Sequence, residues 1–148
     1  MSGNILLSIR PKYANKIFEQ IKTVELRKVR PKRLEPGDLV LIYVSSPVQA
    51  LVGAFKVDQI VEKPLKDLWH IVRKKAGVTR QEFENYYEGV SAGVGIFWSV
   101  QNLWQLPEPI TLEMLKQQHF HPPQGFRYAT TSETAFFNEV TQKSRWNE

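Results

Sequence analysis

The chain has 148 residues, 42% of them hydrophobic, and a formal net charge of +5. This length suits one domain with its own core, so we expect a single domain over residues 1–148. The absence of cysteine excludes disulfides, thiolate zinc sites and cysteine nucleophiles. The polar N-terminus and the lack of an apolar run of about 18 residues predict a cytoplasmic protein without a membrane segment.

The first elements follow from hydrophobic periodicity. Alternating apolar residues predict a strand over residues 4–10. Tyr13, Ile17 and Ile21 then recur every fourth residue, which predicts an amphipathic helix of about three turns. An extended segment follows from Val24, so a helix gives way to a strand within a few residues.

Two further strands are expected after a turn. Proline and glycine in residues 34–38 predict the turn. The apolar run over residues 39–44 predicts a strand buried on both faces. A longer strand over residues 50–60 follows, in which Gly53 marks a bulge or bend.

The second half mixes helices with short extended segments. A helical stripe runs from Leu65 towards Gly77, and Thr79 with Glu82 has the spacing of a capping box that begins the next helix. The glycines between residues 89 and 95 predict a turn that enters a strand. The remaining expected elements are a strand over 96–104, a bend at 107–109, a short helix over 111–115, an extended 126–128 and a helix over 132–140. This order predicts an α+β domain built around a small β-barrel, with a core over 4–104 and a C-terminal extension over 105–148 packed on it.

The positive charge is concentrated in one segment. Between Arg10 and Arg33 lie nine basic and two acidic side chains, a net charge of +7. Such a segment predicts a surface that binds a polyanion, although a merely solvated face has the same composition. The side chains expected to hold a nucleic-acid backbone are Lys12, Lys28, Arg30, Lys32 and Arg33.

Within that segment, Lys22, Glu25 and Arg27 form the main candidate site. Alternate residues of a strand share a face, so Glu25 and Arg27 point the same way, and the last turn of the helix brings Lys22 near them. A carboxylate between two cations accepts hydrogen bonds and leaves donors free for an anionic or polar ligand. The alternative interpretation is a surface ion-pair cluster of small energetic consequence.

Three other residues are candidate ligand contacts. Ser45 and Ser46 line a pocket mouth or belong to an ordinary polar loop. Arg127 stands between two aromatic residues in a segment flanked by proline and glycine. His119 and His121 lack the spacing of a metal site, so neither a metal nor a cofactor is expected.

Residues 20–27, Gln-Ile-Lys-Thr-Val-Glu-Leu-Arg, resemble the Gly-x-Lys-x-x-Glu-x-Arg motif of ASCH domains, which belong to the PUA-like superfamily. Residues 7–14 resemble the strand and helix that lead to this motif, and residues 34–42 resemble the turn and strand after it. The resemblance is good over residues 4–60 and weaker as far as Trp104. Gln20 stands where the motif has glycine, which alters the helix-to-strand turn unless the backbone at this position keeps a negative φ.

The resemblance implies a PUA-like β-barrel flanked by helices, with a cleft lined by the motif residues. Related domains are associated with RNA binding, and some cleave RNA or hydrolyse modified nucleosides. In amidohydrolases that act on N4-acetylcytidine, a lysine and a threonine three residues apart act with a distant glutamate. Lys22 matches that lysine, whereas Glu25 occupies the threonine position, so the nucleophilic mechanism is not carried over.

Three functions remain open at this point. The first is an RNA- or nucleotide-binding module that uses Lys22, Glu25 and Arg27. The second is a hydrolase acting on a modified nucleoside or on RNA, with Lys22 as base or nucleophile and Glu25 as proton carrier. The third is an interaction domain of transcription or translation whose basic surface docks an acidic protein. The oligomeric state is not predicted.

Overall fold

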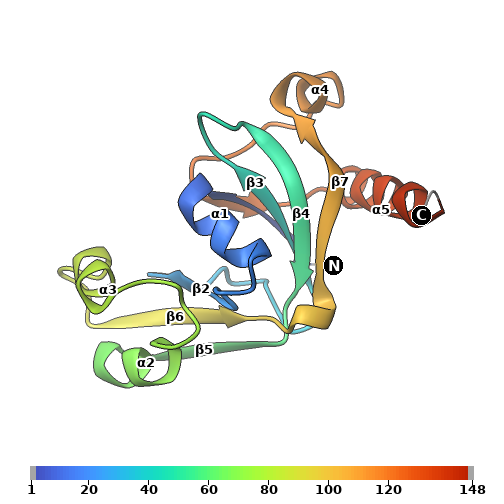
Figure 1. Cartoon of the computed structure of the whole chain (residues 1–148). Coiled ribbons are helices and arrows are strands. Elements are labelled where there is room, and N and C mark those ends of the chain that lie inside the picture. Colours follow the sequence, from blue (N-terminus) through green and yellow to red (C-terminus); the bar gives the residue numbers. More distant parts are fainter. Residues whose placement is uncertain (1–2, 147–148) are drawn as a thin grey trace.

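The computed structural model describes residues 3–146, with side-chain surroundings as far as residue 141 (Figure 1). In chain order the elements are β1 (Ile5–Ile9), α1 (Pro11–Phe18), β2 (Val24–Arg27), β3 (Leu39–Val44), β4 (Ala50–Lys56), β5 (Gln59–Pro64), α2 (Leu65–Val72), α3 (Arg80–Tyr86), β6 (Ala92–Phe97), the 3₁₀ turn η1 (Val100–Asn102), β7 (Leu103–Thr111), α4 (Leu112–Gln117), β8 (Phe126–Tyr128) and α5 (Thr131–Trp146).

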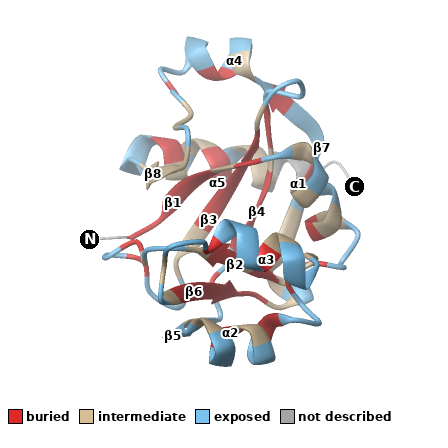
Figure 2. Cartoon of the chain, turned by 90° about the vertical axis from the view of Figure 1, so that its left-hand side faces the viewer, coloured by how far each residue is buried: buried red, intermediate tan, exposed pale blue. Residues whose placement is uncertain are grey.

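The larger sheet has five strands in the order β7-β4-β3-β1-β8. β1 runs parallel to β3, and the other neighbours are antiparallel. The apolar run of β3 predicted a strand covered on both faces, and β3 is almost entirely buried (Figure 2). β1 was predicted only from its alternating pattern, yet it is almost entirely buried as well. These two strands therefore form the centre of the molecule.

The smaller sheet has three strands in the order β2-β6-β5. The long strand expected over residues 50–60 divides near Asp58, whose N–H donates to the carbonyl of Phe97 in β6. The chain thus leaves the larger sheet as β4 and enters the smaller one as β5. The α+β class is confirmed, but the strand pairings over residues 3–146 form two separate sheets, and the expected closure into one barrel is not found.

The core has three parts, arranged as layers. Alternate residues of β1, such as Ile5 and Leu7, share a buried cluster with Ile17 of α1 and Ile96 of β6. The opposite face of the larger sheet is covered by residues from the second half of the chain, such as Phe137 of α5. The far face of the smaller sheet is covered by α2 and α3.

Both edge strands of the larger sheet come from the last third of the chain, because β7 begins at Leu103 and β8 at Phe126. β7 pairs with β4, and β8 pairs with β1 over Ile5–Leu7. Residues 105–148 were expected to pack on a finished core, whereas the strands in this part extend the sheet itself. That residues 1–148 form a single domain stays a prediction.

Two segments rich in glycine or proline lie within strands. Gly93 and Gly95 were expected in a turn, but they lie inside β6, and a Cβ at Gly93 would stand 2.5 Å from the Tyr87 ring. The bend expected at 107–109 falls inside the edge strand β7, between the pairs Gly53–Gln105 and Leu51–Ile110, where the register with β4 shifts. An edge position tolerates proline because it needs fewer backbone donors.

α1 ends earlier than its periodicity predicted. The helix ends at Phe18, and Ile21 is 53% exposed. Gln20 takes a φ of 65°, and the N–H groups of Gln20 and Ile21 donate to the carbonyls of Ile17 and Lys16. This is a Schellman motif with glutamine at the position that favours glycine. The backbone at Gln20 therefore does not keep the negative φ at which glutamine would replace glycine without strain.

Candidate functional site

A cavity of about 510 Å³ lies between the end of β1, the start of α1, β2 and α3. Lys22, Glu25 and Arg27 all line it, so the structure brings the three motif residues to one site. They arrive there because β2 places Glu25 and Arg27 on one face, while the Schellman turn carries Lys22 back towards α1.

Lys22 and Glu25 form a buried pair that is not hydrogen bonded. Their side chains are 3% and 12% exposed, and Lys22 Nζ lies 4.0 Å from Glu25 Oε2. This distance exceeds that of a hydrogen bond. Lys22 Nζ donates instead to the carbonyl of Ala76 at 3.2 Å, and the buried Glu25 Oε2 accepts no hydrogen bond from the described residues.

Burial lowers the pKa of the Lys22 ammonium, because the charged form is poorly solvated. The neighbouring Glu25 carboxylate acts in the opposite direction, and Lys16 adds to the lowering. Lys22 also lies 5.9 Å from the centroid of the Tyr13 ring. The amine is thus held between a carboxylate, a carbonyl and an aromatic face.

Arg27 and Tyr86 form a second part of the lining. The Arg27 guanidinium is half-buried and has no hydrogen-bond partner among the described residues. The Tyr86 ring is 38% exposed, and Lys28 Nζ lies 5.1 Å from its centroid. Beneath this part, the Tyr87 hydroxyl donates to the Arg27 carbonyl at 3.0 Å and fixes the end of β2.

Glu82 joins the two helices that flank the cavity. The capping box is confirmed: Glu82 Oε1 accepts from the Thr79 N–H, and the Glu82 N–H donates to Thr79 Oγ1. Its Oε2 accepts from Lys12 Nζ at 3.0 Å and from the Tyr13 hydroxyl at 2.9 Å. The Thr79 backbone bond, followed by these two side-chain donors, lowers the pKa of Glu82 to about 2.

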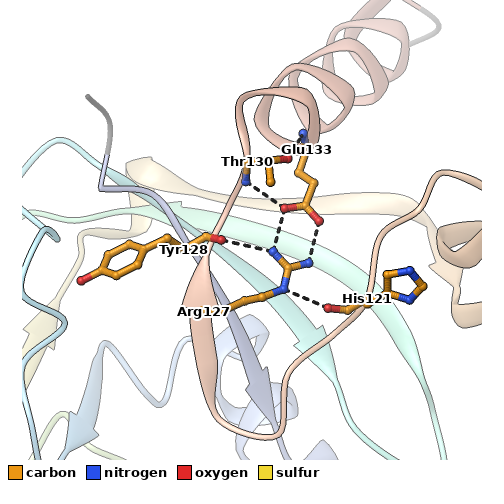
Figure 3. Close-up of polar contacts among 5 residues, drawn as sticks. All are labelled: His121, Arg127, Tyr128, Thr130 and Glu133. Atoms are coloured by element: carbon orange, nitrogen blue, oxygen red, sulfur yellow. Dashed lines mark hydrogen bonds and ion pairs between the residues drawn. The ribbon is translucent and has the colours of Figure 1, made fainter.

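Arg127 does not line the cavity, and its side chain is held by hydrogen bonds to other residues of the chain (Figure 3). Its guanidinium donates to both carboxylate oxygens of Glu133, at 2.8 and 2.6 Å. It also donates to the carbonyls of His121 and Tyr128. Its geometry is that of a structural fork between β8 and the start of α5, with few donors left for a ligand.

The two serines also lie outside the cavity lining. Ser45 donates from its backbone N–H to the carbonyl of Ile9 at 2.9 Å, at the point where β3 ends. Ser46 is exposed in the following turn. Ser45 therefore contacts a residue of the cavity wall without reaching the cavity.

The basic side chains expected to hold a nucleic-acid backbone divide into two groups. Arg30 donates to the carbonyl of Leu34 and pairs with Glu35 at 3.2 Å, and Arg33 stacks on the Tyr128 ring at 3.7 Å. Lys12 pairs with Glu82. The exposed Lys28 and Lys32 make no hydrogen bond or ion pair with any described residue.

Sequence reasoning missed part of the lining. Arg10, Tyr13 and Glu82 line the cavity, although only their roles in charge, core or capping were anticipated. Tyr13 and Glu82 are 69 residues apart, so no local pattern indicates their hydrogen bond. The signal that was available is the capping box, which places Glu82 in the first turn of α3.

The described residues contain neither a metal-binding cluster nor a membrane-spanning helix. Among the side chains that the structure describes, no group of three or more His, Asp or Glu is placed to hold a metal ion. No helix of the described part combines the length and apolar character needed to cross a bilayer.

Comparison with known proteins gives a consistent result. The sequence profile of the ASCH domain matches residues 7–123. A Zymomonas mobilis protein called an ASCH domain-containing ribonuclease is 28% identical over 140 residues, covering 93% of this chain and 92% of its own. The crystal structure of ASCH from Zymomonas mobilis superposes with a TM-score of 0.82 at 26% identity, covering 94% and 96% of the two chains. The N-terminal domain of Staphylothermus marinus McrB shares the fold, with a TM-score of 0.61 at 7% identity over 97% and 94% of the chains.

Proposed function

We propose that this chain, which belongs to the ASCH domain family, binds RNA or its nucleotides in the cavity between β2 and α3. The observation that carries the proposal is the meeting of three groups in one cavity: an exposed aromatic ring, and a guanidinium and a carboxylate oxygen that make no hydrogen bond with any described residue. A volume of about 510 Å³ suits a ligand the size of one nucleotide. The ribonuclease name of the Zymomonas relative supports an RNA ligand.

The basic surface would extend this site along an RNA strand. Lys28 and Lys32 follow Arg27 in the chain and have free ammonium groups, so they suit contacts to phosphates. Arg30 and Arg33 are held by internal partners and would contribute positive potential more than direct contacts. We therefore narrow the group expected to hold the RNA backbone to Lys28 and Lys32.

A salt titration with a fluorescein-labelled single-stranded RNA tests this proposal. Affinity should fall steeply with ionic strength, because phosphate contacts release counterions. Arg27→Ala should weaken binding about tenfold, as expected for the loss of a charged hydrogen-bonded contact. The matched control is Arg73→Ala, which removes an exposed arginine outside the cavity. Equal binding by the two variants, or no RNA binding even at low salt, would contradict the proposal.

A second candidate function is RNA cleavage at the same site. It is favoured by the relative's name and by Lys22, whose lowered pKa increases the fraction of neutral amine that can act as a base. The amidohydrolase alternative has less support, because Glu25 replaces the threonine and Thr23 does not line the cavity.

Cleavage is decided by incubating the protein with RNA oligomers and with acylated nucleosides. Lys22→Met keeps the length of the side chain and removes the amine, so it should abolish cleavage, while Lys63→Met, at an exposed position of β5, should not. Cleavage that persists in Lys22→Met would exclude Lys22 as the base.

A further inference from the structure

We propose that the deep end of the cavity, at Lys22 and Glu25, receives the edge of a nucleobase, and that the phosphate stays outside at Arg27. This inference rests on the proposed function and assigns an orientation to the ligand within the same site. It also makes Glu25 a residue that selects for a hydrogen-bond donor on the base.

The charges at the deep end disfavour a phosphate there. Lys22 and Glu25 compensate each other, so the pair offers no net positive charge. A phosphate that approached Lys22 would also come close to the Glu25 carboxylate, and like charges in a buried site repel strongly. A free anion would find better partners elsewhere in the cavity.

The same pair is well suited to a neutral group with a donor beside an acceptor. The 4.0 Å gap leaves Lys22 with unused N–H groups and Glu25 with an Oε2 that accepts no hydrogen bond from any described residue. This oxygen is itself buried, so a base reaches it once the Glu25 side chain turns towards the cavity that it lines. The Watson–Crick edge of every nucleobase presents an N–H donor next to an acceptor, so one base can donate to Glu25 while accepting from Lys22. Base binding would thereby satisfy two buried groups that are poorly satisfied in the free protein.

Arg27 and Tyr86 provide the outer half of the site. The Arg27 guanidinium has its fork of donors free, which is the geometry that binds phosphate. Tyr86 lines the same cavity as Glu25 and Arg27. A base stacked on this ring would direct its edge to Glu25 and its phosphate to Arg27.

The test compares ligands that carry the base, the phosphate or both. The probes are the four ribonucleosides, their 5′-monophosphates and ribose 5-phosphate, with affinities measured by NMR titration. For the wild type, nucleosides should shift the backbone amides of Lys22 and Glu25, whereas ribose 5-phosphate should shift that of Arg27 alone.

Two variants separate the contribution of the base to affinity from that of the phosphate. Glu25→Gln should weaken nucleosides and nucleotides by the same factor, about tenfold, and leave ribose 5-phosphate unchanged. Arg27→Ala should remove the advantage of nucleotides over nucleosides. Glu84→Gln, at an exposed glutamate of α3 outside the cavity, is the control for charge. The Arg27 side chain makes no hydrogen bond with any residue that the structure describes, so that variant should fold even where Glu25→Gln does not.

Specific outcomes would overturn the orientation. Tighter nucleotide binding by Glu25→Gln would mean that the carboxylate repels a phosphate beside it. Binding of ribose 5-phosphate at Lys22 would mean the same. A protein that binds RNA strongly but shows no nucleoside effect at Glu25 would refute this inference and leave RNA binding intact, whereas absence of all RNA binding would remove the proposed function itself.

Discussion

Replacing Gln20 with glycine should stabilise the protein, although it removes a side chain at the end of α1. Gln20 has a φ of 65°, in the left-handed region that glycine enters without steric cost. For other residues that region costs about 1–2 kcal/mol. The greater freedom of glycine in the unfolded chain offsets about 0.4–1 kcal/mol of this. We therefore expect a net gain of about 0.5–1 kcal/mol in the free energy of unfolding.

The assay is urea unfolding, supported by thermal melts. The urea midpoint should rise with an unchanged m-value, and the melting temperature should rise by about 1–4 °C for a chain of this size. Glu19→Gly is the matched control, because Glu19 is the adjacent exposed residue and has a φ of −78°. Glycine there should destabilise by about 0.5–1 kcal/mol. If both variants shift stability in the same direction, the strain assigned to Gln20 is refuted.

Three further predictions concern the supports of the site and of the sheet. Glu82→Gln should cost about 1–2 kcal/mol at neutral pH, since three donors lose a charged acceptor. Because the folded pKa of Glu82 is about 2 and its ordinary value is 4.5, this contribution is present above pH 4.5 and lost as the pH falls towards 2, which urea unfolding at several pH values would show. Arg127→Ala should cost about 2–3 kcal/mol, because among the described residues the 7% exposed Glu133 keeps only its bond from the Thr130 N–H, and it should leave RNA affinity unchanged in the folded protein. Gly93→Ala should cost about 1–3 kcal/mol through overlap with the Tyr87 ring, measured by the urea midpoint.

The sequence predicted the short segment that carries the motif residues better than it predicted the other residues that line the cavity. Lys22, Glu25 and Arg27 lie within six residues, so strand alternation and the end of one helix suffice to bring them together. Glu82 was predicted as a cap because that pattern is local, but its bond to Tyr13 depends on how α3 packs against α1. Long-range contacts of this kind leave no periodic signal.

Arg127 shows how a local signal can be overlooked. Its aromatic neighbours drew attention to a ligand, whereas Thr130 and Glu133 have the spacing of a capping box at the start of α5. That box fixes Glu133 where both of its oxygens also accept from Arg127. In contrast, Gly93 is needed within a strand because the Tyr87 ring leaves no room for a side chain there. Composition alone does not indicate this contact.

The family match ends before the larger sheet is complete, because β8, which pairs with β1, lies beyond the last matched residue. The ASCH match ends at residue 123, and β8 begins at Phe126. A chain cut at the end of the match would leave the flank of β1 bare, with the backbone groups of Ile5 and Leu7 open along a strongly apolar strand. Bare edges of this kind recruit strands from other molecules. The short strand β8, three residues long, thus protects the centre of the sheet from self-association.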